Sequence, residues 1–520
     1  MKNRGLKIIA LLLCIAMAAA MFAACGTNSN KGGDEINYDI DLTQKPKLNI
    51  LMPNSGKPIE AVNSNVNAQL IQQITGYEVE YTQLPAADSS KVLNTSLMDR
   101  KDYQAMKLTK DQFSDLVKNE MLLDITDALQ VFAPDILASI DQESWDVVTV
   151  DGRIYGIPER ASSDNIENMI VFNQDMLLQN NLEIPTTLAE FENALMVLTQ
   201  ALGRPALTFD KYTPLVYTIS AAFGIYSDWQ EYTTEDGKTQ VLYYMNAPRY
   251  KDYVDYMNKL YKAGYIDMET ATNTAADAIN KFTNNQAACF AGSLWSVPSI
   301  ISGMQAKGTI SATEAAGELP NYLGYLRSLK ENASDPEKIY RASGYTYITA
   351  IPFYQADKAG YALDWMNSKI KDTEDAHNFR SIVLGEEGVH WTYSHTDGYL
   401  PIAANFAEKD DASYYLTGSN EKVYTQYWLA RVRKQPELFR AWSILMDRAD
   451  EVGVYNVVDF TPPIEDYNSH RAAMEEYAQD QFYIMMKDGT GKLQEYLDKL
   501  NNLQGGKKAT DALNAWYKNH

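Results

Sequence analysis

The sequence of 520 residues is poor in cysteine and histidine, with three of the first and five of the second. Cys14, Cys25 and Cys289 lie far apart and match none of the paired spacings of zinc sites. We therefore expect no metal site and no disulfide framework, and no motif calls for a cofactor. Cys289 lies in the apolar run "AACFAG", where a small buried side chain is the simplest interpretation.

Basic residues are also scarce. The chain has 46 lysines and arginines against 68 aspartates and glutamates, which gives a formal net charge of −22 at pH 7. Such a surface repels nucleic acid and anionic lipid headgroups. We therefore expect neither of these as a binding partner.

The apolar run at residues 8–22 is too short for a comfortable membrane span and follows three basic residues. This pattern predicts a signal peptide over residues 1–24. Small residues precede Cys25, which resembles the lipobox of bacterial lipoproteins, where the cysteine receives a lipid and becomes the new N-terminus. Phe22 departs from the leucine usual in that motif, and an ordinary secretory signal with Cys25 incidental is the alternative.

Residues 25–45 are then predicted to form a lipidated cysteine and a flexible tether, rich in Gly, Asn and Ser between residues 26 and 34. Burial of acyl chains at about 0.8 kcal/mol per CH₂ would hold the protein on the outer face of a cell membrane. Roughly 490 residues would remain after processing, which is more than one core normally organises, so we expect two or more domains.

Aromatic residues with a polar group are abundant: the chain has 35 tyrosines and 8 tryptophans against 15 phenylalanines. Such side chains suit surfaces that are partly apolar and partly hydrated, including clefts that hold sugars. Tyrosine also occurs at the edges of ordinary cores, so composition alone only favours a sugar site.

Strands alternate with helices in the first part of the chain. We predict strands within 45–53, 77–85 and 103–108, each followed by a helical pattern, as in a parallel α/β sheet. Ligands of such sheets bind beyond the carboxyl ends of the strands. The loops at 54–57, 86–89 and 109–111 are therefore expected to face a site.

Further along the chain, Asp-Gly turns predict hairpins within 143–159 and 232–246. Strands are predicted to begin near 168, 287 and 344, and Thr187 is the expected N-cap of a helix. The last hundred residues show mostly helical patterns.

An ordered series of segments resembles the family 1 extracellular solute-binding proteins of ABC importers. "ESWDVVTVDGRIYGIPE", "MIVFNQDML" and "IPTTLAEF" are similar to consecutive blocks of that family. "LGEEGVHWTYSHTDG" and the closing "MMKDGTGKLQEYLDKLNNLQGGKKATDALNAWY" are similar to blocks of a longer Gram-positive lipoprotein branch. "DRKDYQAMKL" departs from the family's usual segment before the third strand, which puts the sugar contacts of that loop in doubt.

The resemblance implies an α/β fold of two lobes, the periplasmic-binding-protein-like fold of type II, with a mixed sheet flanked by helices in each lobe and extra C-terminal helices. Residues 46–160 plus 285–343 are predicted as lobe 1, and 161–284 plus 344–520 as lobe 2. The chain would cross between the lobes near 158–168, 284–289 and 342–347.

The resemblance also implies where the ligand would bind. Trp295 follows a predicted strand and would stack on a sugar ring, as in sugar-binding relatives, although it could instead pack under its own helix. Hydroxyl groups would be bound by charged or polar side chains at loop tips. The expected ligand-binding residues are Trp295, Tyr212, Asn54, Lys57, Lys110, Asp111, Trp391, Asp88 and Trp229.

The function implied is capture of a small-molecule solute, most simply an oligosaccharide, by a monomer whose lobes close on it and which then delivers it to an ABC permease. No catalytic residues are expected. A lipoprotein sensor of the same fold is one alternative. A secreted glycoside hydrolase is another; it needs two paired carboxylates, and Glu386 and Glu387 are candidates that nothing singles out.

Overall fold

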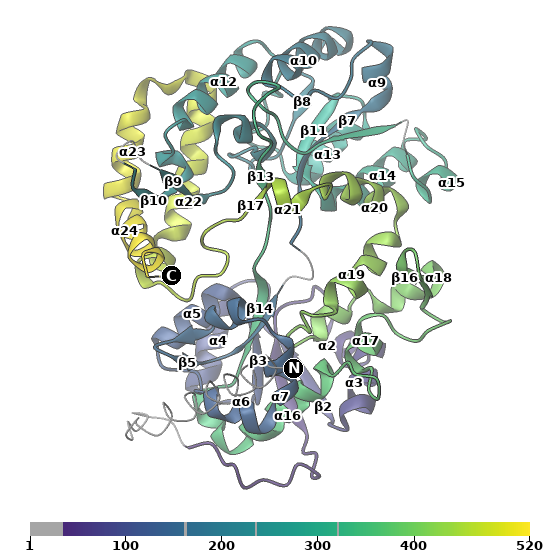
Figure 1. The fold of residues 1–520 in the computed structure, drawn as a ribbon, viewed down its shortest axis with the longest axis vertical. Coiled ribbons are helices and arrows are strands. Elements are labelled where there is room, and N and C mark those ends of the chain that lie inside the picture. The colour runs from purple at the N-terminus through teal and green to yellow at the C-terminus, as the bar shows by residue number, and fades with distance from the viewer. Residues whose placement is uncertain (1–34, 161–163, 234–236, 320–321, 520) are drawn as a thin grey trace, which may run out of the picture.

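The computed structural model describes residues 35–160, 164–233, 237–319 and 322–519. These residues form two lobes, one above the other in Figure 1, with several chain segments between them. The predicted signal peptide and Cys25 lie outside the described residues. Within the described ranges, no helix combines the length and the apolar character that crossing a membrane requires.

Lobe 1, the lower lobe of Figure 1, is built on a five-stranded mixed sheet in the order β2-β1-β3-β14-β6. The first three strands pair in parallel, as the alternating pattern predicts, whereas β14 runs antiparallel to both β3 and β6. The strands are β1 (Leu48–Met52), β2 (Val79–Gln83), β3 (Ala105–Leu108), β14 (Tyr345–Ala350) and β6 (Ile157–Arg160).

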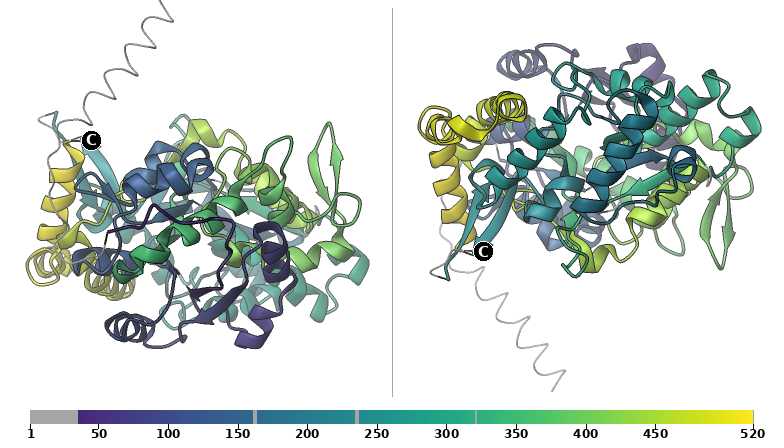
Figure 2. Two further views of the ribbon diagram at one scale, coloured as in Figure 1. Left: turned by 90° about the horizontal axis from the view of Figure 1, so that it is seen from below. Right: turned by 90° about the horizontal axis from the view of Figure 1, so that it is seen from above.

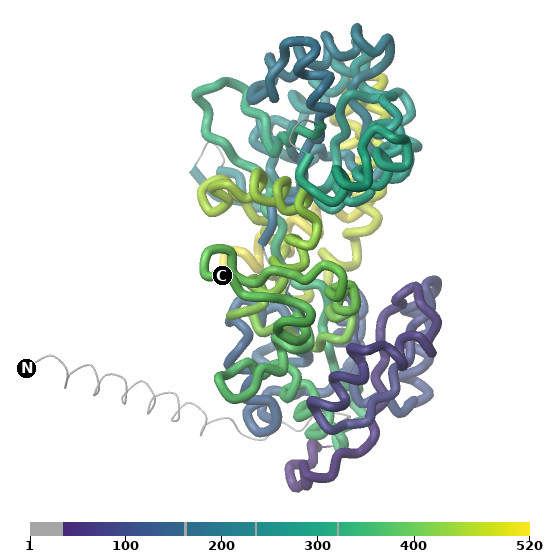
Figure 3. Tube along the Cα trace, turned by 90° about the vertical axis from the view of Figure 1, so that its right-hand side faces the viewer, coloured from purple at the N-terminus to yellow at the C-terminus, as the bar shows by residue number. Residues whose placement is uncertain are grey.

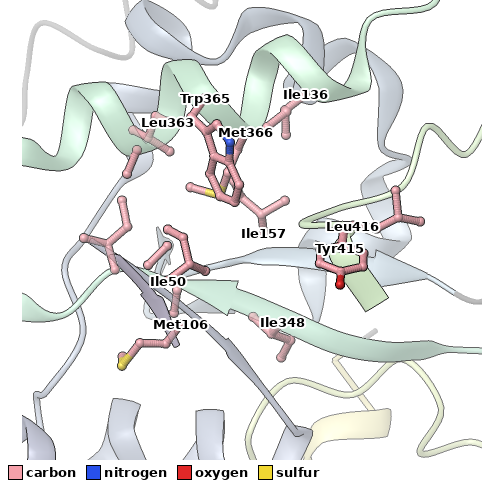
Figure 4. Packing of buried hydrophobic residues seen from close by; sticks show 14 of the residues in the cluster. Ile50, Met106, Ile136, Ile157, Ile348, Leu363, Trp365, Met366, Tyr415 and Leu416 are labelled. Atoms are coloured by element: carbon pink, nitrogen blue, oxygen red, sulfur yellow. The ribbon is translucent and has the colours of Figure 1, made fainter. Parts of the chain in front are cut away.

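Helices cover the sheet of lobe 1 because its central strands are apolar on both faces and must be buried on both. Ile50 and Ile348 from the sheet and Trp365 from α16 lie in one core (Figure 4), and each is fully buried. The helices are α2 (Ile59–Asn63), α3 (Val66–Thr75), α4 (Ser89–Met98), α5 (Lys110–Lys118), α6 (Thr126–Phe132), α7 (Pro134–Ser139), α8 (Gln142–Asp146), α16 (Ala359–Ile370), α17 (Asn378–Val383), α18 (Ala403–Phe406) and α19 (Tyr424–Arg433).

Gly156 shows why the "YGIP" segment needs a glycine. A Cβ at this position would lie 2.5 Å from Cγ2 of Ile348 and 3.2 Å from the ring of Phe113. The glycine therefore lets the chain pass directly over β14 just before β6 begins, and β6 can then pair with β14.

Lobe 2 is built on a four-stranded sheet in the order β12-β7-β11-β8. β7 (Asn168–Asn173) runs antiparallel to both β11 (Cys289–Ser293) and β12 (Leu323–Leu326), and β8 (Leu207–Thr208) runs parallel to β11. The helices are α9 (Gln174–Gln179), α10 (Leu188–Leu202), α11 (Tyr217–Ser220), α12 (Tyr250–Lys262), α13 (Ala275–Thr283), α14 (Val297–Ala306), α15 (Ala312–Ala315), α20 (Pro436–Leu445), α21 (Ala449–Val452), α22 (Glu465–Asp488), α23 (Leu493–Asn502) and α24 (Gly506–Tyr517).

Local signals in lobe 2 act as predicted. Thr187 caps α10 in a capping box with Glu190, so two otherwise unpaired backbone N–H groups are satisfied. The predicted C-terminal helices α22 to α24 form one layer at the edge of the molecule, yellow in both views of Figure 2. Asn514 of α24 bonds both backbone groups of Val241, which ties this layer to the hairpin β9 (Trp229–Thr233) and β10 (Thr239–Tyr243).

Short hairpins and bridges complete the structure. The predicted Asp-Gly turn joins β4 to β5, with Asp151 and Gly152 both at positive φ. The remaining pairs are β4 (Thr149–Val150) with β5 (Arg153–Ile154), β13 (Ile339–Tyr340) with β17 (Gly453–Val454), and β15 (Trp391–Ser394) with β16 (Gly398–Pro401).

The predicted division of the chain between the lobes was wrong in two places. Residues 285–343 carry β11 and β12, which pair with β7, so this segment belongs to lobe 2 and not to lobe 1. Residues from 344 to about 430 carry β14, α16 and α17, which pack in the lobe 1 core; Figure 3 shows this green segment returning to the purple N-terminal lobe. Hydrophobic patterning identified the strands but could not show which strands pair.

The crossings between lobes follow from this correction. The chain crosses just after β6 and again between β13 and β14, near two of the predicted positions. The crossing expected at 284–289 does not exist, because Cys289 pairs with Phe172 and Leu207 inside lobe 2. A third crossing lies within α19, where Ala430 packs in the core of lobe 1 and Val432 in that of lobe 2.

The C-terminal part of the predicted tether is also not free. Ile36, Ile40 and Leu42 pack against the lobe 1 core, and the ring of Tyr38 stacks on Phe132 with 5.8 Å between centroids. Apolar residues spaced along this segment give it a surface to bury. The described residues 35–45 are therefore a packed strap of lobe 1 rather than a flexible linker.

Candidate functional site

A groove of about 690 Å³ lies between the two lobes. It is large enough for a small-molecule ligand of several rings. Both lobes and the crossing segments contribute to its lining, which is formed by Glu159, Arg160, Asn165, Glu167, Trp295, Ala342, Ser343, Gly344, Tyr345, Thr346, Tyr347, Ser413, Tyr414, Tyr424, Trp428, Arg431, Val432 and Leu438.

The floor of the groove is made by β14 and β6 as they leave lobe 1. Tyr345 and Tyr347 lie on β14 on either side of an irregularity in its pairing with β6, and both side chains line the groove. In the antiparallel register they stand opposite Arg160 and Glu159 of β6. Two aromatic rings and two charged groups are thereby placed together at the groove.

The lobe 2 wall is formed where β11 ends. The Ser293 side chain accepts a hydrogen bond from the backbone N–H of Trp295, which starts the short helix η3 (Leu294–Ser296). Trp295 keeps 40% of its surface exposed, an unusual degree for so large an aromatic residue. Its ring meets that of Trp428 of α19 nearly at a right angle, with an interplanar angle of 80° and centroids 5.6 Å apart.

A partly buried carboxylate, Glu167, lines the same groove as Trp295. Burial raises the pKa of Glu167, and hydrogen bonding from the side chains of Trp295 and Asn165 partly opposes that shift. The backbone N–H of Leu294 donates to the carbonyl oxygen of Glu167 at 2.7 Å, which extends the β7–β11 ladder by one step. Glu167 and Trp295 are thus fixed near each other by strand pairing.

An ion pair is buried directly beneath the floor. Nζ of Lys107 lies 2.8 Å from Oε2 of Glu159, and both side chains are almost completely shielded from solvent. Burial lowers the pKa of Lys107 and raises that of Glu159, and each charge opposes the shift of the other. Lys107 also donates to the backbone carbonyls of Ser413, Tyr414 and Leu416 at 3.0–3.1 Å.

Lys107 therefore joins the central sheet to the short helix η6 (Ala412–Tyr415), which carries Tyr414, an aromatic residue of the groove wall. Because its three N–H donors reach these carbonyls and its charge is paired with Glu159, the ammonium group is not available to a ligand.

The Arg160 guanidinium is likewise committed to the protein. It lies 3.4 Å from Glu143 and 3.3 Å from Asp164, and it covers the ring of Phe460 at 4.7 Å. Arg160 connects the segments that cross between the lobes. It lies in the groove lining, but its charge is already paired with carboxylates of the protein.

Of the residues predicted to bind ligand, Trp295 lines the groove and the others do not. Lys110 and Asp111 instead connect the lobes. Nζ of Lys110 donates to the Val458 carbonyl at 3.0 Å, and Asp111 pairs with Arg471 of α22 at 2.6 Å. Burial lowers the pKa of Lys110 to about 8.

The loop residues of lobe 1 are occupied by neighbouring protein groups. The Asn54 amide donates to the Leu84 carbonyl at 3.2 Å, and Lys57 pairs with Asp411. Asp88 takes a left-handed backbone conformation before α4 and lies outside the groove lining. Tyr212 is 68% exposed, but it lies on lobe 2 away from the groove lining.

The predictions for Trp391 and Trp229 were wrong. Trp391 is only 3% exposed and its indole N–H donates to the Gly385 carbonyl at 3.0 Å, while its ring packs on Tyr399. Trp229 is only 2% exposed and packs on Tyr243. Both indoles support the cores of their lobes and offer no face to a ligand. Glu386 and Glu387, considered for hydrolysis, also lie outside the groove lining.

Sequence reasoning missed most of the groove. The sequence "GYTYITAIP" shows Tyr345 and Tyr347 at the start of a predicted strand, but nothing in it indicates the irregular pairing with β6 that lies between them. Tyr414 and Trp428 carry no such signal, since a loop and a helix bring them to the groove from a segment that was expected in the other lobe. Among the described residues, no group of three or more His, Cys, Asp or Glu side chains could hold a metal ion.

Two α/β lobes that share a lined groove define a binding protein of the two-lobed class. The structure is similar to that of an HMO-binding, ABC-transporter-associated solute-binding protein of Bifidobacterium longum infantis, with a TM-score of 0.65 and 15% sequence identity. The alignment covers 91% of this chain and 99% of that one. This likeness confirms the predicted fold.

The sequence model of the bacterial extracellular solute-binding proteins matches residues 68–417, and the chain belongs to this family. It is 30% identical over 272 residues to a Niallia circulans protein named for the butB 5′ region, covering 52% of this chain and 99% of that one. It is 24% identical over 292 residues to a carbohydrate ABC transporter substrate-binding protein of Streptococcus pneumoniae, covering 52% of this chain and 54% of that one. The match thus spans about half the length of the named carbohydrate relative. The family resemblance in the sequence is confirmed.

Proposed function

We propose that this protein captures an oligosaccharide in the groove between its lobes and delivers it to an ABC permease. The groove lined by exposed Trp295 together with tyrosines and carboxylates carries the proposal. Aromatic faces cover the C–H patches of a sugar ring, and carboxylates accept hydrogen bonds from its hydroxyl groups. The carbohydrate-binding relative points in the same direction.

The two lobes would act as a clamp. A ligand that touches Trp295 on lobe 2 and the tyrosines of β14 on lobe 1 makes both sets of contacts only when the lobes are closed. Binding therefore shifts the population towards the closed form, in proportion to the difference in affinity between the two forms. The permease would recognise that form, and no bond of the ligand is broken.

Delivery from outside the cell requires that the protein stay near its permease. A lipid on Cys25 would provide this, with the nine residues after it leading to the packed strap at 35–45. Mass spectrometry of the N-terminal peptide from native membranes tests the anchor. We expect a diacylglyceryl group on Cys25, and the Cys25→Ala protein should appear in the medium.

The binding proposal is tested with the soluble chain from residue 26 in a thermal-shift screen of di- to hexasaccharides, followed by calorimetry. A ligand at 100 times its Kd adds about 2.7 kcal/mol to the free energy of unfolding, which moves the midpoint clearly. Trp295→Ala should weaken binding about tenfold or more. Tyr212→Ala is the matched control, since it also removes an exposed aromatic ring but lies outside the groove. If no glycan moves the midpoint while peptides do, the sugar assignment is wrong.

A glycoside hydrolase is the second candidate because Glu159 and Glu167 both line the groove and such enzymes use two carboxylates. We favour binding without turnover, because Glu159 is held in a buried ion pair with Lys107. Release of reducing sugar from a bound oligosaccharide, abolished by Glu159→Gln, would support the hydrolase instead. A permease deletion that leaves uptake of the ligand intact would favour a sensor.

A further inference from the structure

The helix that crosses between the lobes brings a charged side chain to the groove. Tyr424, Trp428 and Arg431 of α19 are all among the residues that line it. They are four and then three residues apart, which places their side chains on one side of an α-helix. The helical register of α19, which lies between the two lobes in Figure 1, therefore carries Arg431 to the groove.

The guanidinium group of Arg431 has few partners within the protein. One N–H of Nη2 donates to the backbone carbonyl of Asp410, whereas the carboxylate of Asp410 is occupied by Lys434 at 2.7 Å. Within the part of the chain that the structure describes, Arg431 forms no ion pair with a carboxylate, and the rest of its five N–H donors make no hydrogen bond. The side chain is half-buried, and a partly buried charge without a counter-charge is costly.

The other charged groups of the lining have their charge balanced or disfavoured within the protein. Glu159 is paired with buried Lys107, and Arg160 is paired with two carboxylates. Burial raises the pKa of Glu167, which favours its neutral form. A guanidinium group, in contrast, does not lose its proton in proteins. The charge that persists without a partner in the groove is therefore the positive charge of Arg431.

We propose that the groove takes an acidic oligosaccharide and that Arg431 binds the carboxylate of one of its uronic acid residues. The inference rests on the proposed function and narrows its ligand class. A guanidinium group and a carboxylate match in a planar, bidentate pair, which the hydroxyl groups of a neutral sugar cannot form.

The formal net charge of −22 does not exclude such a ligand. Repulsion between the ligand and the acidic surface is screened by salt over about 8 Å at physiological ionic strength. A bidentate ion pair inside the groove acts at contact distance, where this screening is weak. The acidic surface therefore slows the approach of the ligand but leaves the contact with Arg431 intact.

The first test uses matched pairs of ligands. Trisaccharides of galacturonate, glucuronate and mannuronate are each compared with their methyl esters, which keep the rings and hydroxyl groups but lack the charge. In calorimetry the protein of the screen should bind at least one acid about tenfold or more tightly than its ester, and added salt should weaken the acid more than the ester. If neutral oligosaccharides bind as tightly as every acid, the inference is overturned while the proposed function stands. If neither kind binds, the proposed function fails and the inference falls with it.

The second test locates the preference at Arg431. Arg431→Gln removes the charge and should weaken binding of the acid about tenfold or more, but change binding of its ester less than about twofold. Arg431→Lys keeps the charge without the planar fork and should restore part of the preference. Arg433→Gln is the matched control, since it removes an arginine of the same helix that lies outside the groove lining, and it should keep the wild-type ratio.

Circular dichroism and the thermal midpoint without ligand check that each variant folds. If Arg431→Gln fails to fold, the smaller preference expected of Arg431→Lys decides the question. A preference for the acid that persists unchanged in the Arg431 variants would overturn the assignment.

Discussion

The buried ion pair beneath the groove gives the sharpest prediction. Lys107→Met should lower the free energy of unfolding by about 3–5 kcal/mol, because removing its paired lysine leaves the buried Glu159 carboxylate opposed only by the charge of Lys369. The lysine side chain is completely buried and the glutamate side chain is 6% exposed, so water cannot replace the lost ammonium group. Three backbone carbonyls of the loop at 413–416 also lose their donor.

The double variant Lys107→Met/Glu159→Leu separates these contributions. It removes both charges of the pair and leaves the unpaired carbonyls and the neighbouring buried Lys369, so it should be more stable than Lys107→Met alone by about 1–3 kcal/mol at most. Equilibrium urea unfolding followed by fluorescence and by circular dichroism measures the difference, and coincident transitions check for two-state behaviour. Lys91→Met, an exposed lysine on α4 of the same lobe, is the control and should change stability by less than about 0.5 kcal/mol.

The result that would refute this reasoning is additivity. If the double variant loses as much free energy of unfolding as the single variants Lys107→Met and Glu159→Leu lose together, the ammonium and the carboxylate do not interact in the folded protein. A loss below about 1 kcal/mol for Lys107→Met would also refute it, since that is the range of an exposed pair.

Three further predictions concern packing, pH and the contacts between lobes. Gly156→Ala should cost about 1–3 kcal/mol in thermal unfolding, because its Cβ would lie 2.5 Å from Ile348, whereas Gly491→Ala meets nothing within 4 Å and should be nearly neutral. Burial raises the pKa of both Asp459 and Glu421 to about 7, so the folded protein keeps these protons to a higher pH than the unfolded chain. These two carboxyl groups should therefore lower the free energy of unfolding as pH rises from about 4 to about 7, with no further change above that. The double variant Asp459→Asn/Glu421→Gln should show a smaller change of stability with pH over this range. Arg471→Gln breaks the Asp111–Arg471 ion pair between the lobes. It should raise the radius of gyration of the ligand-free protein in small-angle X-ray scattering and change the free energy of unfolding by at most about 1 kcal/mol. The double variant with Asp111→Asn should show no further increase in the radius of gyration.

Local chemistry in the sequence was sufficient for most elements of the structure. The strands β1, β2, β3 and β7, the capping box at Thr187 and the Asp-Gly hairpin all lie where short-range patterns placed them. These features depend on neighbours within a few residues, such as a side chain that reaches its own helix N-terminus or a turn that needs positive φ. The order of the blocks was enough to indicate the family.

The predicted ligand-binding residues came from the family resemblance rather than from local chemistry. Of these residues, Trp295 lines the groove and the others do not. Trp295 lies in the groove because the end of β11 faces the other lobe. Trp229 and Trp391 look similar in the sequence but turn inward to pack on tyrosines. Lys110 and Asp111 lie at the expected edge of the sheet, but Lys110 donates to the Val458 carbonyl and Asp111 pairs with Arg471.

The sequence by itself determined the elements, the acidic charge and the two-lobed family, because each of these follows from composition, periodicity or an ordered series of motifs. Only the tertiary structure decided which lobe each segment joins and which aromatic rings remain exposed. β14 is apolar enough to be a central strand in either sheet; the backbone hydrogen bonds to β3 and β6 that assign it to lobe 1 come from residues about 190 to 240 positions away. The groove lies where such distant segments meet, so its lining could not be predicted from local sequence.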